Sequence, residues 1–263
     1  MNAAVQETIG TGLASQGGHW YSADGAPAYE IKAKAGHMRA VTLRDARKLN
    51  LYPSVTGILG CAAKPQLERW KIEQAMMACI TLPRVEWENE TDFMRRALED
   101  SQQQALVARE RGTIIHAEIE RSFAGNADPA YAEYVQPVRR WLDTRFGNIK
   151  WQAEKSFASP HGYGGKVDLY SRDIGGVVLD FKTKDFSDPL AVKGYDEQGT
   201  QLAAYAMGLD LGAQALRINL FISTTVPGLI VPVEWKLETF ARHWSMFQAL
   251  LAYWQADRGY APC

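Results

Sequence analysis

Several features are scarce in this sequence, and each scarcity excludes a class of protein. The 263 residues contain only three cysteines, Cys61, Cys79 and Cys263. Three scattered thiols exclude a disulfide framework, a zinc-finger spacing and a four-thiolate iron–sulfur cluster within this chain, and they fit incidental thiols in a reducing compartment. The 29 basic and 30 acidic side chains leave a net charge of −1. The chain as a whole therefore does not attract nucleic acid or an anionic membrane, and a nucleic-acid partner would need a locally basic groove.

Long apolar runs and targeting signals are also missing. The most apolar stretch, LRINLFISTTVPGLIVPV, is broken by Arg217, Asn219 and two prolines, so no segment has the length of a membrane span. Residues 1–18 have neither the basic region nor the apolar region of a secretory signal, and their Gly, Ala and Ser content predicts a frayed start. No G-x-x-x-x-G-K-[ST] loop occurs, which argues against a helicase motor or nucleotide cofactor. We expect a cytoplasmic protein without membrane contact.

Hydrophobic residues make up 46% of the chain, which is enough for a sizeable core. Periodicity predicts helices at 65–82, 90–123 (bent or split near Gly112), 128–147, 196–212 (closed by Gly212) and 237–259, with strands at 151–158, 164–171, 177–183, 215–224 and 229–235. In YPSVTGIL, Ser54 or Thr56 is expected to cap a short helix. This order indicates an α+β protein with about five strands flanked by helices and a helical N-terminal lobe. We expect residues 1–50 to form a partly flexible extension and residues 51–263 a single domain.

The stretch VVLDFKTK carries the first chemical signal. Alternate residues of a strand share a face, so Asp180 and Lys182 point the same way as Val178. If the preceding strand, GGKVDLY, pairs with it antiparallel, Asp168 can lie beside Asp180. Two carboxylates about 4 Å apart repel by roughly 4 kcal/mol at an effective dielectric near 20, and a divalent cation would offset that repulsion. Lys182 could then orient or deprotonate a water near the metal.

Two structural alternatives compete with a metal site at these strands. Asp180 and Lys182 could be a solvated pair on a surface hairpin, which would contribute little to stability. The apolar neighbours in VVLDF argue for burial and against that alternative. A buried, purely structural ion pair remains a second alternative.

Further motifs in a fixed order extend the pattern. RGTIIHAEIE places His116 and Glu120 four residues apart, AEKSFASPHGYGGKVDL places Glu154 before a Gly-Gly-x-x-Asp turn, and QLAAY places Gln201 and Tyr205 four residues apart. The spacing of Asp, then Asp-x-Lys 12 residues later, resembles the PD-(D/E)XK nuclease superfamily. The ordered set G-x-x-x-H, E, G-x-x-D, D-x-K, Q-x-x-x-Y resembles its RecB-type exonuclease branch. YPSVTGIL is similar to a segment of phage and mitochondrial genome maintenance exonuclease-like members, and the resemblance covers roughly residues 50–210.

The resemblance implies a restriction-endonuclease-like α/β sandwich with a central mixed sheet and one or two Mg²⁺ or Mn²⁺ ions. A set of His116, Asp168, Asp180 and the main-chain carbonyl of Phe181 would hold the metal. Lys182 would be the catalytic lysine, while Gln201 and Tyr205 would position that lysine or the substrate backbone. Glu120 could help to hold a second metal, and Glu154 could support the site from behind. Without the resemblance, His116 would be read as a satisfied core histidine, and Gln201 and Tyr205 as a helix face on the sheet.

The implied activity is a metal-dependent DNA exonuclease that acts on DNA ends in recombination, repair or phage DNA processing. Its setting would be the cytoplasm of a bacterium or phage-infected cell, with a recombination or single-strand annealing or binding protein as a candidate partner. Candidate DNA contacts are Lys166, Lys184, Ser54 and Thr56, although ordinary surface lysines fit as well. The basic residues between 32 and 48 could follow a DNA backbone or form a solvated face. A structure-specific endonuclease and a catalytically inactive nucleic-acid-binding module are the competing functions.

Overall fold

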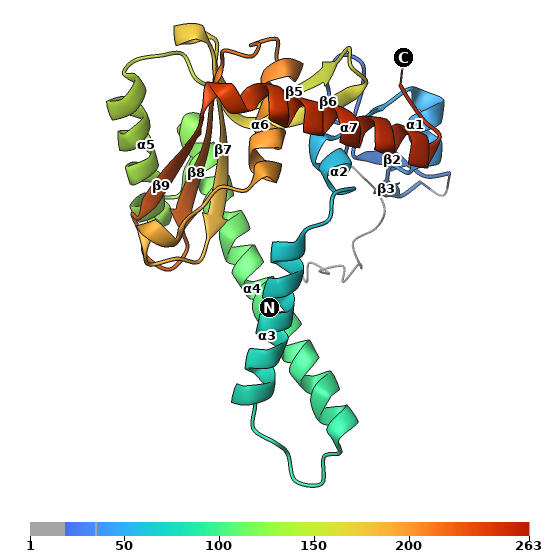
Figure 1. Ribbon diagram of the computed structural model, residues 1–263, viewed down its shortest axis with the longest axis vertical. Helices are drawn as coiled ribbons and strands as arrows, with labels where there is room; N and C mark the ends of the chain where they lie inside the picture. The colour runs from blue at the N-terminus through green and yellow to red at the C-terminus, as the bar shows by residue number, and fades with distance from the viewer. Residues whose placement is uncertain (1–18, 35, 263) are drawn as a thin grey trace, which may run out of the picture.

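A computed structural model describes residues 19–34 and 36–262 of the chain. Its centre is a five-stranded mixed sheet in the order β5-β6-β7-β8-β9, in which only β7 and β8 run parallel. The strands are β5 (Gln152–Ser159), β6 (Tyr163–Ser171), β7 (Val177–Lys184), β8 (Leu216–Ser223) and β9 (Ile230–Trp235). The predicted α+β architecture and its five strands are confirmed, with boundaries shifted by one or two residues. Figure 1 shows the sheet between α5 on one side and α6 and α7 on the other.

The described α-helices are α1 (Leu43–Leu49), α2 (Val55–Leu59), α3 (Pro65–Thr81), α4 (Glu90–Phe123), α5 (Ala132–Phe146), α6 (Asp196–Gly208) and α7 (Phe240–Arg258). Short 3₁₀ turns lie at Pro129–Tyr131, Asp173–Gly175, Pro189–Ala191 and Leu237–Thr239. Two boundary predictions need correction. The alternative of a split near Gly112 is wrong, because α4 runs without interruption from Glu90 to Phe123. Helix α6 ends at Gly208 and not at Gly212, because Asp210 adopts a left-handed backbone (φ 56°) that turns the chain out of the helix.

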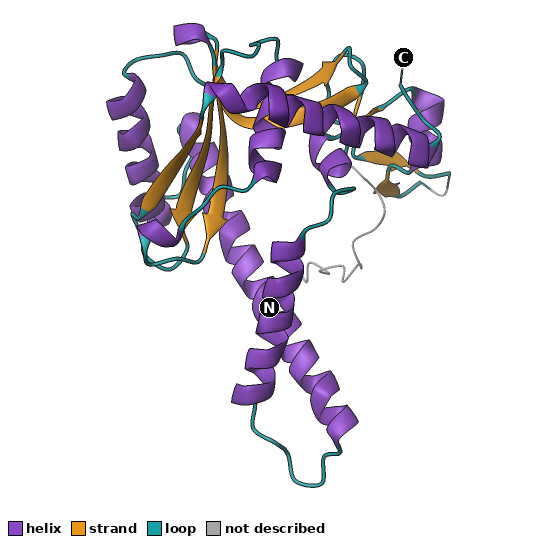
Figure 2. Ribbon diagram, viewed as in Figure 1, coloured by secondary structure: helices purple, strands orange, loops and turns teal. Residues whose placement is uncertain are grey.

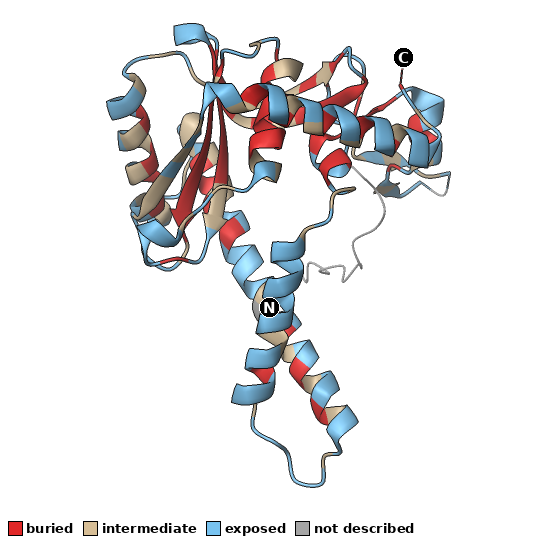
Figure 3. Cartoon of the chain, viewed as in Figure 1, coloured by how far each residue is buried: buried red, intermediate tan, exposed pale blue. Residues whose placement is uncertain are grey.

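Two apolar cores lie on opposite faces of the sheet. Val177, Leu179 and Phe181 of β7 pack with α4 and α5, whereas Val178 packs with α2, α6 and α7. The alternation within VVLDFKTK therefore divides the strand as predicted. Asp180 and Lys182 fall on the side of α6, as the polar members of a face whose neighbours are apolar. Figure 3 shows β7 and β8 as mostly buried strands.

The N-terminal segment contributes two small pairs of strands. Strand β1 (Trp20–Tyr21) pairs antiparallel with β4 (Tyr52–Pro53), and β2 (Glu30–Lys32) pairs antiparallel with β3 (Met38–Ala40). Trp20, Val41 and Ala46 belong to the same core cluster as α6 and α7. The predicted frayed start and Cys263 lie outside the described residues, and Cys61 and Cys79 are free thiols.

Helix α3 and the N-terminal half of α4 form a hairpin that projects away from the sheet (Figures 1 and 2). Much of its apolar surface faces outward, including Trp70, Met76, Ile80 and Trp87, and Ile80 is 75% exposed. No helix in the described part of the chain is both long and apolar enough to cross a membrane.

Candidate functional site

The site forms where strands β6 and β7 separate. Their antiparallel pairing ends at Leu169↔Leu179, so Asp168 and Asp180 are the next residues facing each other across the gap. Beyond that point the backbone hydrogen bonds between the two strands stop. The Phe181 N–H instead donates to the Asp168 side chain, at 2.7 Å from Oδ2. The prediction that antiparallel pairing brings the two acids together is confirmed, and Asp168 lies in the fork between the strands.

Helix α4 closes the fork from one side. Its His116 places Nε2 3.0 Å from Asp168 Oδ2 and Nδ1 2.8 Å from Glu120 Oε1. Isoleucines 115 and 119 of the same helix are buried against β7, which fixes the direction of this face. Among the described residues, His116, Glu120 and Asp168 form a group whose ligand atoms lie within 4.8 Å of one another. An imidazole between two carboxylates is a donor set that suits Mn²⁺ as well as Mg²⁺.

The acids on both sides of His116 determine its charge. Burial lowers the pKa of His116, but the hydrogen bonds to Asp168 and Glu120 outweigh burial and raise that pKa to about 10. In the metal-free arrangement the ring is therefore an imidazolium at neutral pH, and it has to lose one proton before a ring nitrogen can bind a metal ion.

Helix α6 closes the fork from the other side. Gln201 donates from Nε2 to Asp180 Oδ1 and to the Tyr205 hydroxyl, both at 2.9 Å. Lys182 Nζ lies 2.7 Å from Asp180 Oδ2 and 3.2 Å from Gln201 Oε1. The predicted pairing of Gln201 and Tyr205 on one helix face is thus present, and that face points at the acid and the lysine of β7.

Burial and charge set the protonation states on this side. Burial raises the pKa of Asp180, the Lys182 ammonium lowers it, and the charge of Asp168 raises it again, with a net rise. Burial lowers the pKa of Lys182, but the charges of Asp180 and Asp168 prevail and raise it. Lys182 is therefore an ammonium at neutral pH, suited to orienting a water or stabilising negative charge and not to removing a proton. Burial, with Asp180 and Asp168 nearby, raises the pKa of Tyr205 well above its usual value, so its hydroxyl stays neutral.

A second acidic pair lies behind His116. Burial raises the pKa of Glu154, the ion pair with Lys166 lowers it, and the neighbouring Glu120 raises it again, with a net rise. Glu154 has a left-handed backbone (φ 58°) within β5 and interrupts the pairing opposite Asp168. A non-glycine residue in that conformation is rare and is often found at functional sites. The pair borders a cavity of about 490 Å³ that is also lined by Phe123, Arg139 and Trp151.

The candidate DNA contacts differ in exposure. Ser54 is 4% exposed, and its hydroxyl accepts the Gly57 N–H at 3.0 Å as the N-cap of α2, so it does not face solvent. Thr56 and Lys184 are exposed, and Lys184 lines a cavity of about 1500 Å³ between the helical hairpin and the sheet. In the basic segment 32–48, Arg39 forms an ion pair with Asp45.

Gly112, the first residue of the G-x-x-x-H pattern, explains how α4 comes so close to β7. A Cβ at this position would lie 2.6 Å from Thr183 Oγ1 and 3.3 Å from Thr183 Cβ. Any larger residue would force Thr183 or the helix to shift, so glycine favours this close approach, which brings His116, one turn later, to the fork. The glycine thus serves close packing, and not the helix break that the sequence suggested.

We expect Gly112→Ala to destabilise the protein by about 1 kcal/mol, because overpacking costs about 1–3 kcal/mol and the helix propensity of alanine returns about 1 kcal/mol. The free energy of urea unfolding measures this change. The double variant Gly112→Ala/Thr183→Ala should recover most of the loss, since truncating Thr183 makes room for the new methyl group. Equal stability of Gly112→Ala and the wild type would contradict the close approach.

Sequence reasoning missed one residue of the site. Asn219 on β8 is fully buried and donates from Nδ2 to Asp180 Oδ2 at 2.9 Å. Its signal was present in the sequence, because Asn219 interrupts an otherwise apolar strand. That interruption was read only as evidence against a membrane span. The register Asp180↔Asn219, which brings the two side chains together, exists only once β7 and β8 pair.

Comparisons with known proteins find only distant similarity. No protein-family model matches this chain, and no curated protein shows significant similarity to it. Among solved structures, SSO0001 is 14% identical, with a TM-score of 0.28 over 71% of this chain and 86% of its own. The alkaline exonuclease LHK-Exo from Laribacter hongkongensis is 14% identical, with a TM-score of 0.35 over 73% of this chain and 95% of its own. At these TM-scores the likeness carries no argument, so function has to be argued from the side chains.

Proposed function

We propose that this protein is a metal-dependent nuclease that hydrolyses phosphodiester bonds at DNA ends. The observation that carries the proposal is the convergence of His116, Asp168, Asp180, Lys182 and Gln201 at one fork in the sheet. These side chains come from α4, β6, β7 and α6, and the sequence order of the motifs resembles that of RecB-type exonucleases. A structural ion pair alone would not require a histidine and a further acid from a separate helix.

The residues fit a divalent cation. His116, Glu120 and Asp168 offer one nitrogen and two carboxylates within 4.8 Å of one another, so a divalent cation could replace the His116 proton as the positive charge between the two acids. The proposed ligand set is His116, Asp168, Asp180 and the Phe181 carbonyl, with Glu120 close enough to His116 to join it. An ionised carboxylate has about four acceptor positions. Asp180 uses three of them for Lys182, Gln201 and Asn219, which leaves about one for a metal ion.

Each group then has a role in phosphodiester hydrolysis. A bound Mg²⁺ or Mn²⁺ would supply Lewis acidity and a nucleophilic water. The Lys182 ammonium would hold that water or stabilise the charge that develops on the phosphate. Gln201, oriented by the Tyr205 hydroxyl, would hold the Lys182 and Asp180 side chains in their relative positions. Glu120 and Glu154 would support His116 or a second ion.

The proposed activity is tested with end-labelled linear DNA, single- and double-stranded, incubated with Mg²⁺ or Mn²⁺. We expect release of labelled nucleotides from linear DNA, with covalently closed circular DNA left intact. Comparing 5′ and 3′ labels gives the direction of digestion. Efficient cutting of circles would instead indicate an endonuclease. A folded protein that cuts neither substrate, and shows no calorimetric Mn²⁺ binding dependent on Asp168 and Asp180, would be a non-catalytic binding module.

A further inference from the structure

The Asp180 carboxylate is held by more than the motif residues. Three donors converge on it: the Lys182 ammonium, the Gln201 amide and the Asn219 amide, at 2.7, 2.9 and 2.9 Å. Lys182 and Asn219 both approach Oδ2, from neighbouring positions on β7 and β8. Since Asp180 is only 3% exposed, these contacts and not solvent decide its orientation.

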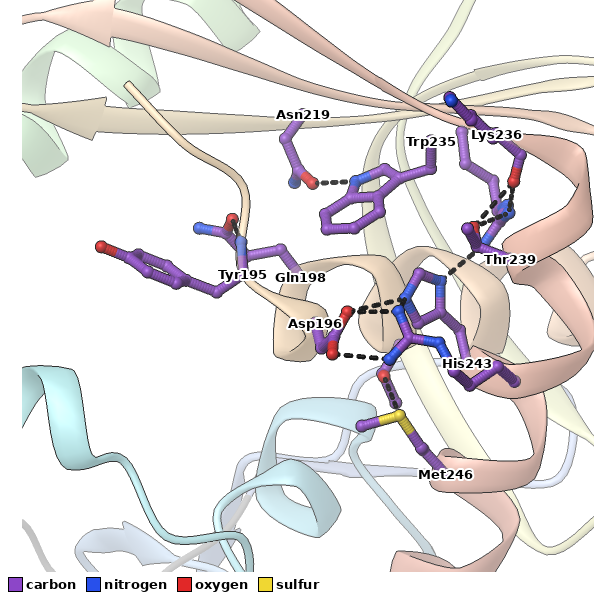
Figure 4. A network of polar contacts seen from close by, with 12 residues as sticks. Tyr195, Asp196, Gln198, Asn219, Trp235, Lys236, Thr239, His243 and Met246 are labelled. Carbon is purple, nitrogen blue, oxygen red and sulfur yellow. Dashed lines mark hydrogen bonds and ion pairs between the residues drawn. The ribbon is translucent and has the colours of Figure 1, made fainter. Parts of the chain in front are cut away.

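Asn219 is itself fixed at its other end. Its Oδ1 accepts a hydrogen bond of 2.8 Å from the Trp235 indole N–H, as Figure 4 shows. An amide that donates at one end to a carboxylate and accepts at the other from an indole has one orientation, because turning it over would set oxygen against oxygen and N–H against N–H. Trp235 therefore selects the orientation in which Asn219 donates to Asp180.

The Trp235 ring is in turn held by the elements around it. It meets the His243 ring edge-on at a centroid distance of 4.9 Å, and a Cβ on Gly194 would lie 2.9 Å from its Cζ2. His243 is fully buried, with Arg217 3.1 Å from its Nδ1. Asp196 lies 3.2 Å from its Nε2 (Figure 4). The residues before α6, the N-terminal part of α7 and the edge strand β9 thus all contribute to packing around the Trp235 indole. Gln201, the second amide donor to Asp180, is carried by the same α6.

We propose that Asn219, oriented by Trp235, is a positioning residue that holds the Asp180 carboxylate in the geometry needed by Lys182. The expected effect on the rate rests on the proposed nuclease function. The effect of Asn219 on the orientation of Asp180 does not depend on activity. Asn219 acts through Asp180, so it contributes to the rate and not to substrate binding.

Two variants test this role. Asn219→Leu removes the donor and keeps a γ-branched side chain with the same number of non-hydrogen atoms, and Trp235→Phe keeps one aromatic ring but removes the N–H that orients Asn219. The matched control is Trp254→Phe in α7, a tryptophan that is 7% exposed and packs on Trp20 and Tyr260, away from Asp180. We expect kcat to fall about 10- to 100-fold in Asn219→Leu and about 10-fold in Trp235→Phe, with KM within about twofold, as for residues that orient a site from behind. Trp254→Phe should leave kcat within about twofold.

Crystal structures of the metal-free variants give a readout that does not depend on activity. We expect the Asp180 carboxylate to rotate and its contact with Lys182 to lengthen in both site variants, but not in Trp254→Phe. If Asn219→Leu does not fold, Trp235→Phe decides alone, because the matched Trp254→Phe variant accounts for the loss of the second ring and leaves the lost N–H as the difference. An inactive wild type would overturn the proposed function, and the structures would still decide the positioning role. Unchanged Asp180 and Lys182 positions, or kcat unchanged in the folded site variants of an active enzyme, would overturn the inference.

Discussion

Lys182→Ala is expected to lower the rate of DNA cleavage by at least about three orders of magnitude, which corresponds to about 4 kcal/mol of lost transition-state stabilisation. Lys182 is the ammonium nearest to Asp180 and Gln201 in the fork, and its raised pKa keeps it charged at neutral pH. The measurement is the single-turnover rate on end-labelled linear DNA at saturating Mg²⁺.

The matched control is Lys184→Ala, two residues further along the same strand. Lys184 is exposed, and we expect its loss to change the cleavage rate by less than about fivefold, mainly through KM. Circular dichroism of both variants separates a lost reaction from a lost fold. Equal nucleotide release by the wild type and Lys182→Ala would show that the assigned mechanism is wrong.

Asp168→Asn is expected to weaken Mn²⁺ binding by more than about 100-fold and to slow cleavage by about 1000-fold, because a neutral amide replaces the carboxylate between His116 and Phe181. The fold should survive this change. The asparagine oxygen can still accept the Phe181 N–H, so the hydrogen bond at the end of the β6–β7 pairing is kept. Isothermal calorimetry with Mn²⁺ measures the binding, and the end-labelled assay measures the rate.

Asp173→Asn serves as the control for a carboxylate near β6. Asp173 follows the strand and accepts the Lys150 N–H at 2.8 Å from an exposed position, away from the fork. Its Mn²⁺ affinity and cleavage rate should match those of the wild type within about threefold. If Asp168→Asn binds Mn²⁺ as tightly as the wild type, then Asp168 is not a metal ligand.

Local spacing in the sequence was sufficient to assign several contacts. Residues four apart on a helix meet, which is why His116 contacts Glu120 and Gln201 contacts Tyr205. Alternation on a strand was enough to place Asp180 and Lys182 on one face with Val178. Both predictions rest on periodicities of 3.6 and 2.0, which depend on the backbone alone. The same periodicities gave the helices and the five strands.

The structural roles of Gly112 and Ser54 could not be predicted from the sequence. Gly112 suggested a break in the helix because glycine lowers helix propensity, whereas its reason for being there is the close approach of α4 to Thr183. Ser54 was similarly read both as a cap and as a DNA contact. The structure shows that it caps α2 and is buried, because the chain around it packs into the core.

What the sequence by itself determined is the set of elements and the chemistry on each face: a strand with an acid and a lysine, one helix with His116 and Glu120, and another with Gln201 and Tyr205. Only the tertiary structure decided which of these faces meet. His116 and Asp168 are 52 residues apart, and Asp180 and Asn219 are 39 apart. Such contacts depend on strand register and on how closely a helix approaches the sheet, and no local periodicity specifies either. The packing of the whole sheet creates the fork between β6 and β7. It also creates the hydrogen bonds by which Trp235 orients Asn219 and Asn219 orients Asp180.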